Sequence, residues 1–366
     1  MKKPQLIWDI KPVSYILGKD AVNLSSKKLA EYNKTIVLVD ENTEKQCLPV
    51  FTELLDNVAI DGVICINADK NNKNIDQAIF VWGELSKYGA GRDSLLINLG
   101  GGVVTDLGGF AAATFKRGIN FINYPTSLLG MVDAAIGGKT GIDFGGIKNQ
   151  VGLFTNPKSV IIDPVFLKTL DQRQLRSGYA ELLKCGLIMD NDLWENLKDS
   201  VYDQIEDWNS FIVQAARNKV DIVRHDTFEK GLRKILNFGH TIGHAIESFY
   251  INRNIGITHG EAIAAGMICE TYISSKVYEF DCVCFNEVIQ VVDNNFERFG
   301  LGTGDIDELL TYIKQDKKNK NGKYRFSLLR RLGKSVHDIE IEDDLIRSSL
   351  DFYITKKDCH GEQHNS

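Results

Sequence analysis

The chain has 366 residues, of which 43% are hydrophobic and 25% are charged, and its formal net charge is −6 at pH 7. This length can hold two domains with separate cores, and the negative charge argues against a surface that binds nucleic acid or an anionic membrane. No signal peptide is evident after Met1, no stretch reaches the ~20 apolar residues that span a bilayer, and the seven cysteines are scattered, so we expect a cytoplasmic protein with reduced thiols.

The first half of the chain alternates short apolar runs, rich in β-branched residues, with helical segments. Strands are predicted at residues 35–39, 62–66, 94–99, 120–123 and 160–162, and helices at 44–55 and 75–88. This order predicts an α/β domain with a mostly parallel, doubly wound sheet.

From Asp171 onward the pattern becomes helical. Helices are predicted at residues 171–189, 192–205, 208–224, 237–249, 260–278, 284–299 and 341–354. Asn321-Gly322, followed by residues 323–329, predicts a turn that leads into a hairpin. The domain boundary is expected at residues 163–170, which gives an α/β domain at 1–170, a mainly helical domain at 171–358 and a flexible tail at 359–366.

A glycine-rich turn, Gly100-Gly101-Gly102, follows a predicted strand and precedes an apolar helix. Such a turn brings backbone N–H groups to a pyrophosphate. Thr105 occupies the third glycine position of the strict dinucleotide fingerprint, so a tight structural turn remains the alternative interpretation. Residues 137–140 resemble the end of a P-loop, but Asp133 stands where that motif needs glycine, which excludes it.

Polar groups accumulate after this turn, in glycine-rich surroundings. They are Lys116, Arg117, Thr126, Ser127, Asp133, Lys139, Lys148 and Asn149. Because a doubly wound fold binds its ligand at the carboxyl ends of its strands, we expect these loops to line a cleft. A cationic pocket beside a dinucleotide site indicates an anionic, phosphorylated small substrate.

The helical half begins with Glu181 and Lys184, which lie on the same face of a predicted helix among apolar neighbours. A surface ion pair is one interpretation, but the apolar setting favours a buried pair, and a buried glutamate needs a partner or a metal ion.

Three of the seven histidines follow within twenty positions. His240 and His244 share one face of a helix, His259 begins the next helical run, and Glu247 and Glu261 are near them. The cluster favours a metal or proton-transfer site over solvated or core histidines. Spacing alone leaves open which two of the three histidines would hold a metal.

Six motifs in this order resemble the 3-dehydroquinate synthase family of sugar-phosphate cyclases. They are GGGVVTDLGGFAAATFKRG, PTSLLGMVDAAIGGKTGI, GGIKNQVG, GYAELLKCGLI, GLRKILNFGHTIGHAIE and HGEAIAAGM, and the resemblance extends over residues 14–356. It implies an N-terminal NAD-binding domain, a helical metal-binding domain, an active site in the cleft between them, and a homodimer.

The resemblance also implies roles for individual residues. Glu181, His240 and His259 would bind Zn²⁺ or Co²⁺, with His244 facing the substrate. The implied NAD contacts are Asp40, Lys73, Gly102, Val103, Asp106, Thr126, Ser127, Lys139, Lys148 and Thr169. The implied substrate contacts are Asp133, Lys139, Asn149, Lys184, Lys219, Arg233, Asn237 and His244, with one of Lys317 and Lys318, and with Arg117 offered to the phosphate near the dimer interface.

The chain departs from the family pattern in one loop. Lys70 stands where an acidic residue usually contacts the adenosine ribose, which predicts weaker NAD binding, although Asp69 is adjacent. Asp143 stands where the family often has asparagine, a smaller difference.

The implied reaction is part of the shikimate pathway and converts 3-deoxy-D-arabino-heptulosonate 7-phosphate to 3-dehydroquinate and phosphate. NAD⁺ takes and later returns a hydride, and the metal acts as a Lewis acid. One alternative is a valiolone-type cyclase, in which Asn237 and His244 would be replaced. Another is a metal-dependent oxidoreductase of the glycerol dehydrogenase type, which lacks the phosphate-directed lysines.

Overall fold

The computed structural model describes residues 6–10, 12–68, 73–145, 147–278, 280–314 and 324–355. Asp69, Lys70, Lys317, Lys318, the Asn321-Gly322 turn and the predicted tail lie outside these residues. The chain divides into two units. Unit 1 holds the described residues up to Asp171 together with Asp207–Val220, and unit 2 holds Gln172–Glu206 and the described residues from Asp221 on. The chain thus passes between units at three places, whereas the sequence predicts a single boundary at 163–170.

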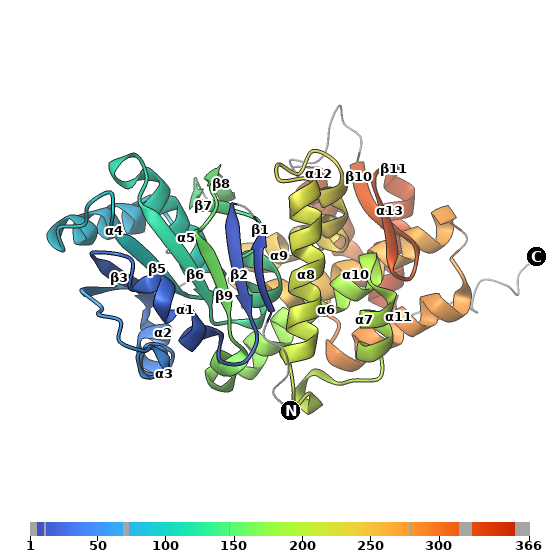
Figure 1. Ribbon diagram of the computed structural model, residues 1–366. Helices are drawn as coiled ribbons and strands as arrows, with labels where there is room; N and C mark the ends of the chain where they lie inside the picture. Colours follow the sequence, from blue (N-terminus) through green and yellow to red (C-terminus); the bar gives the residue numbers. More distant parts are fainter. Residues whose placement is uncertain are drawn as a thin grey trace, which may run out of the picture. The chain divides into compact units, whose positions relative to one another are not determined.

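Within the described residues, unit 1 is built on a seven-stranded sheet in the order β1-β2-β9-β6-β5-β3-β4 (Figure 1). β1 and β2 pair antiparallel, and the other neighbouring strands of the sheet run parallel. The strands are β1 (Leu6–Ile10), β2 (Val13–Leu17), β3 (Thr35–Asp40), β4 (Gly62–Ile66), β5 (Leu95–Gly100), β6 (Asn120–Pro125) and β9 (Ser159–Ile162). The five predicted strands are confirmed. β1 and β2 were not predicted, because Asp9 and Ser14 interrupt their apolar runs.

The central strands are apolar throughout because both of their faces are covered. Ile36 and Leu38 share one core with α4 (Ile75–Lys87) and α5 (Gly102–Thr114), while Val37 and Val39, which alternate to the other face, are equally buried. Glycine lets α5 approach the sheet closely. A Cβ at Gly108 would lie 2.0 Å from Asn98 Oδ1.

The rest of unit 1 consists of short elements. They are α1 (Ala21–Leu29), α2 (Glu41–Gln46), α3 (Leu48–Leu54), the 3-10 turns η2 (Phe115–Arg117) and η4 (Pro164–Thr169), the π-helical turn η3 (Gly130–Ala134), and the hairpin of β7 (Lys139–Phe144) and β8 (Ile147–Phe154). The single helix predicted at 44–55 is wrong, because the chain breaks at Cys47 and α3 restarts with Pro49 in its first turn. The hairpin was missed because β8 is exposed along its whole length and carries no buried apolar face.

Unit 2 is mainly helical and is arranged around α10 (His259–Tyr278), which packs against α6, α9, α11, α13 and β10. Its elements are α6 (Gln172–Met189), α7 (Asn191–Leu197), η5 (Tyr202–Gln204), the end of α8 (Asn209–His225), η6 (Leu232–Asn237), α9 (His240–Asn252), α11 (Cys282–Asn295), η7 (Thr303–Asp305), α12 (Ile306–Lys314), β10 (Tyr324–Arg331), β11 (Lys334–Ile341) and α13 (Asp343–Thr355). The predicted fold class, an α/β half followed by a helical half, is confirmed. No helix among the described residues has the length and apolar composition needed to cross a membrane.

Several details of unit 2 differ from the prediction. The helix expected at 192–205 ends at Leu197, the helix expected at 284–299 ends at Asn295, and α12 was not predicted. α9 begins at His240 rather than at 237, since Gly239 adopts a left-handed conformation with φ 77°. The strand predicted after Asn321-Gly322 is β10, and its hairpin with β11 turns at Gly333, where φ is 69°.

Candidate metal centre and dinucleotide site

Helices α9 and α10 touch through glycines, and this contact brings the histidines together. A Cβ at Gly266 would lie 1.9 Å from the carbonyl oxygen of Gly239 and 2.7 Å from the amide nitrogen of Gly243. Side chains therefore cannot separate the two backbones at the crossing. The first residue of each helix is a histidine, His240 and His259, so close packing of the helices places both at one site.

The three clustered histidines have ligand atoms within 4.8 Å of one another. Buried Glu181, on α6, lies among them, and its Oε1 is 3.6 Å from Nε2 of His240 and 3.6 Å from Nε2 of His259. Ligand atoms about 2.0–2.2 Å from a tetrahedral metal ion are separated by about 3.3–3.6 Å. The donor set and its spacing therefore fit a divalent metal ion.

The second ring nitrogens of these two histidines face acceptors away from Glu181. His240 Nδ1 lies 3.1 Å from the carbonyl oxygen of Phe238, and His259 Nδ1 lies 3.7 Å from a carboxylate oxygen of Glu247. Metal-binding histidines typically use the second nitrogen in this way, which fixes the ring orientation. Burial lowers the pKa of His259, but Glu181 and Glu247 outweigh it and raise that pKa to about 9 in the metal-free protein. A metal ion would have to displace this proton.

Glu261 ties the start of α10 to the start of α6. Arg173 donates to both carboxylate oxygens, at 2.7 and 2.8 Å, and Arg176 donates to one of them at 2.9 Å. The amide of Thr258 donates to the same carboxylate at 2.8 Å. Burial opposes ionisation, but these donors lower the pKa of Glu261 from 4.5 to about 2. The contacts fix the helix that begins with His259.

Glu261→Gln removes the charge that strengthens the hydrogen bonds from the two arginines. Because the guanidinium groups are partly exposed, we expect the free energy of unfolding to fall by only about 2 kcal/mol at pH 7. The folded-state pKa lies below the unfolded value of 4.5, so the stabilisation is complete above pH 4.5 and is lost as the pH falls toward 2. Urea unfolding of both metal-free proteins at pH 7, 4 and 3 measures this.

The difference between the two proteins should narrow with falling pH, and a constant difference would contradict the assignment. Glu308→Gln is the matched control. Its carboxylate also binds an arginine, Arg253, bidentately. The Glu308 side chain is far more exposed than that of Glu261, so a smaller effect is expected.

In unit 1, predicted NAD contacts gather where parallel strands end. Asp40 ends β3, and α5 begins at Gly102 directly after β5, with Val103 and Asp106 in its first turns. Thr126 follows β6 and donates its amide to Gly100 at 3.0 Å, and the Ser127 hydroxyl accepts from the amide of Gly130 at 3.1 Å. The first-turn N–H groups of a helix lack intrahelical acceptors, so the start of α5 suits a phosphate. Asp40 also caps α2 by accepting from the amides of Asn42 and Thr43.

Buried Lys73 connects the predicted cofactor and substrate residues of unit 1. Its ammonium donates to Asp106 Oδ2 at 3.0 Å and to Asn149 Oδ1, and it lies 3.7 Å from Asp143. Asp143 in turn accepts from the amide of Asn149 at 2.7 Å, where Asn149 has φ 51°. Burial raises the pKa of Asp106, and Lys73 opposes that shift. Lys73, Asp106 and Asn149 thus form one network.

The other predicted residues of unit 1 are less closely grouped. Lys219 pairs with the Asp133 carboxylate and donates to the Asp133 carbonyl oxygen at 2.7 Å. Thr169, on η4, contacts Cys47. Lys139 and Lys148 are exposed on the β7–β8 hairpin, and Arg117 is exposed on η2 with φ 67°.

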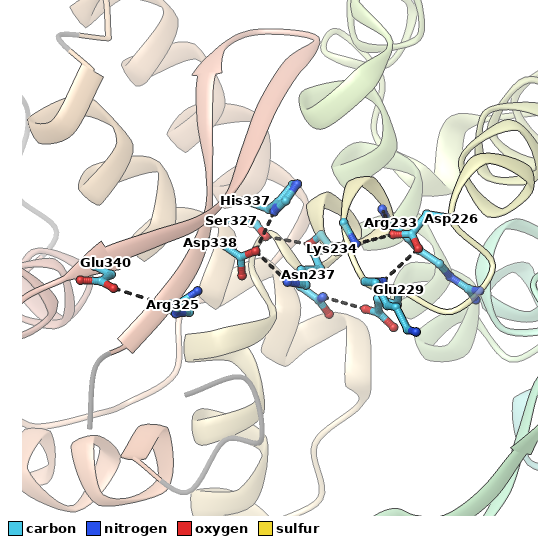
Figure 2. Close-up of polar contacts among 12 residues, drawn as sticks. Asp226, Glu229, Arg233, Lys234, Asn237, Arg325, Ser327, His337, Asp338 and Glu340 are labelled. Carbon is cyan, nitrogen blue, oxygen red and sulfur yellow. Dashed lines mark hydrogen bonds and ion pairs between the residues drawn. The ribbon is translucent and has the colours of Figure 1, made fainter. Parts of the chain in front are cut away.

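In unit 2, the predicted substrate residues Arg233 and Asn237 are held by acidic neighbours (Figure 2). Asp226 accepts from the amide of Arg233 at 3.0 Å, and Asn237 donates to Glu229 at 2.8 Å. Arg233 is buried, and its Nη1 donates to the carbonyl oxygen of Thr227. Lys184, also buried, pairs with Glu181 one helical turn away.

Four residues of these contacts were not identified from the sequence: Arg173, Arg176, Asp226 and Glu229. Nor was Glu270, whose carboxylate accepts a hydrogen bond from the amide of Gly239, next to His240. Most are ordinary charged residues in polar segments and carry no signal. Glu270 does carry one, because it is a lone carboxylate at the end of the apolar run 262–269 in a helix.

Comparisons with known proteins identify the family of this chain. Family models described as 3-dehydroquinate synthase N-terminal and C-terminal match residues 63–177 and 178–319. A 3-dehydroquinate synthase from Parabacteroides distasonis is 42% identical over 332 residues, which cover 90% of this chain and 93% of that protein.

Two solved structures share the fold. A 2-deoxy-scyllo-inosose synthase complexed with carbaglucose-6-phosphate, NAD⁺ and Co²⁺ has a TM-score of 0.80 at 24% identity, over 95% of this chain and 98% of that one. A 2-epi-5-epi-valiolone synthase from Streptomyces hygroscopicus with NAD⁺ and Zn²⁺ bound has a TM-score of 0.81 at 22% identity, over 98% and 100% of the two chains.

Proposed function

Because the chain belongs to the 3-dehydroquinate synthase family, we propose that it converts 3-deoxy-D-arabino-heptulosonate 7-phosphate to 3-dehydroquinate and phosphate. The chain is a lyase-type cyclase by family. The observation that carries the proposal beyond the family match is the Glu181–His240–His259 arrangement, in which both Nε2 atoms lie 3.6 Å from the same carboxylate oxygen.

We propose Glu181, His240 and His259 as the ligands of Zn²⁺ or Co²⁺. The two outer contacts, from Phe238 and Glu247, support this set because they direct both Nε2 atoms inward. When bound, the ion supplies Lewis-acid polarisation of a substrate hydroxyl. Partly exposed His244 lies on the same helix face and is assigned to the substrate, where its imidazole can hold or move a proton at that hydroxyl.

We assign NAD to the start of α5, with Asp40, Lys73, Gly102, Val103, Asp106, Thr126, Ser127, Lys139, Lys148 and Thr169 as its contacts. Bound NAD⁺ supplies the hydride acceptor and donor. The Lys73 network supports the assignment, because it fixes Asp106 in the first turns of α5.

The other residues assigned to the substrate would bind and orient it, and Lys139 is assigned to both NAD and the substrate. They are Arg117, Asp133, Lys139, Asn149, Lys184, Lys219, Arg233 and Asn237. Guanidinium and ammonium groups suit a substrate with both a carboxylate and a phosphate. Asp226 fixes the backbone at Arg233, and this reduces the entropy lost when the guanidinium binds an anion. We further propose that residues 1–170 serve NAD, that residues 171–358 serve the metal and substrate, and that the chain acts as a cytoplasmic homodimer.

Removal of metal tests the proposal. We expect a chelator to abolish phosphate release from the heptulosonate phosphate and added Zn²⁺ or Co²⁺ to restore it, since the open ligand position of a three-residue metal site accepts the substrate oxygen. Phosphate assays before and after chelation measure this. Full activity in the chelated enzyme would contradict the metal assignment, and release from sedoheptulose 7-phosphate instead would indicate a valiolone-type cyclase.

A further inference from the structure

Glu270 is a completely buried carboxylate on α10, at the end of an apolar run. It accepts hydrogen bonds from three backbone amides at the start of the facing helix α9, namely Gly239 at 2.6 Å, Thr241 at 3.0 Å and Ile242 at 3.2 Å. A buried carboxylate is costly unless charge-assisted hydrogen bonds compensate it. The side chain therefore provides an acceptor for these amides.

The amides of Thr241 and Ile242 belong to the first turn of α9, and the third amide is that of Gly239, the residue before the helix. The residue that precedes α9 is Gly239, which has no side chain to cap the helix. First-turn amides need outside acceptors, and a negative charge at this end also interacts favourably with the helix dipole. Glu270 thus caps α9 from another helix, 31 residues away in sequence from Gly239.

His240 lies between two of the capped residues. Its backbone is held on one side by the Gly239 contact and on the other by the Thr241 contact, and its Nδ1 faces the carbonyl oxygen of Phe238. His259 is the first residue of α10, the helix that also carries Glu270. α10 therefore bears one proposed metal ligand, His259, and the carboxylate that holds the backbone beside a second, His240. Metal sites require ligand placement within about 0.5 Å.

We infer that Glu270 is a positioning residue of the metal site, which sets His240 against His259 and Glu181. The inference rests on the proposed function, because it takes those three residues as the ligands. In Glu270→Gln the side chain keeps its size, but the new NH₂ group faces backbone N–H donors. The start of α9 must then shift, and His240 with it.

Zn²⁺ affinity of the metal-free protein is the readout, measured by competition with a chromophoric chelator. We expect Glu270→Gln to weaken Zn²⁺ binding by about 10–100-fold, the usual effect of losing an outer contact of a metal site. The visible absorption of bound Co²⁺ should also change, because it reports ligand geometry. Glu270→Asp retains the charge on a shorter side chain and should bind Zn²⁺ more tightly than Glu270→Gln.

Ser274→Ala is the matched control. Ser274 is fully buried one turn further along α10, and its hydroxyl bonds the Glu270 carbonyl oxygen and the Leu329 amide. We expect its loss to lower Tm and to leave Zn²⁺ affinity and the Co²⁺ spectrum unchanged.

Wild-type Zn²⁺ affinity in Glu270→Gln, with a Tm loss like that of Ser274→Ala, would overturn the inference and reduce Glu270 to a structural role. If Glu270→Gln does not fold, the Zn²⁺ affinity and Tm of Glu270→Asp are compared with those of wild type. A lower Tm with wild-type Zn²⁺ affinity would again overturn the inference. His240→Ala separates this inference from the proposed function. Unchanged Zn²⁺ affinity in that variant would refute the metal site itself.

Discussion

Replacing Glu181 by alanine is expected to empty the metal site and to lower turnover by about 10³-fold or more, since Lewis-acid stabilisation contributes several kcal/mol. His240→Ala and His259→Ala should do the same, because each removes an Nε2 that lies 3.6 Å from the Glu181 carboxylate. Metal content after gel filtration and the rate of phosphate release measure the two effects.

His244→Ala is the matched control for these variants. The ring centroids of His244 and His240, on the same helix, are 5.1 Å apart, but we assign His244 to the substrate. The variant should retain the metal and lose turnover. The ligand assignment fails if His244→Ala empties the site while His259→Ala does not.

Gly266→Ala should lower the free energy of unfolding by about 3 kcal/mol or more, because its Cβ would lie 1.9 Å from the Gly239 carbonyl oxygen and backbone cannot move aside cheaply. Separation of α9 from α10 also displaces His240 from His259, so the affinity for Zn²⁺ should fall. Urea unfolding and metal titration measure both results.

Gly83→Ala provides the comparison within a helix. No atom lies within 4 Å of a Cβ at this position of α4, so we expect a gain of about 0.5–1 kcal/mol from reduced backbone entropy. Equal stability of Gly266→Ala and wild type would contradict the glycine-mediated contact between α9 and α10.

The sequence predicts most elements of the fold where burial leaves a recognisable pattern of apolar residues. β3 is apolar at successive positions because helices cover both faces of the sheet, and it was predicted within one residue. β8 is exposed and has no pattern to detect. The Asn321-Gly322 turn lies outside the described residues. The strand predicted after it is β10, which forms a hairpin with β11 through Gly333, where φ is 69°.

The site was only partly predictable from local patterns. The i,i+4 spacing places His240 and His244 on one face, and the structure brings His259 to them. Glu181 belongs to another helix, so its role came from family resemblance and not from spacing. The contact of Glu270 with the start of α9 depends on how two helices pack, and no local pattern specifies it.

We propose that this chain is a cyclase that regenerates NAD⁺ in every turnover. To test this, the enzyme is given NAD⁺ at a concentration far below that of the heptulosonate phosphate. The amount of phosphate released and the absorbance of NADH are followed together. We expect one phosphate for each substrate consumed and NADH that rises at most to the enzyme concentration, because the hydride returns before product leaves. NADH that accumulates in proportion to substrate, without phosphate, would show a dehydrogenase and contradict the claim.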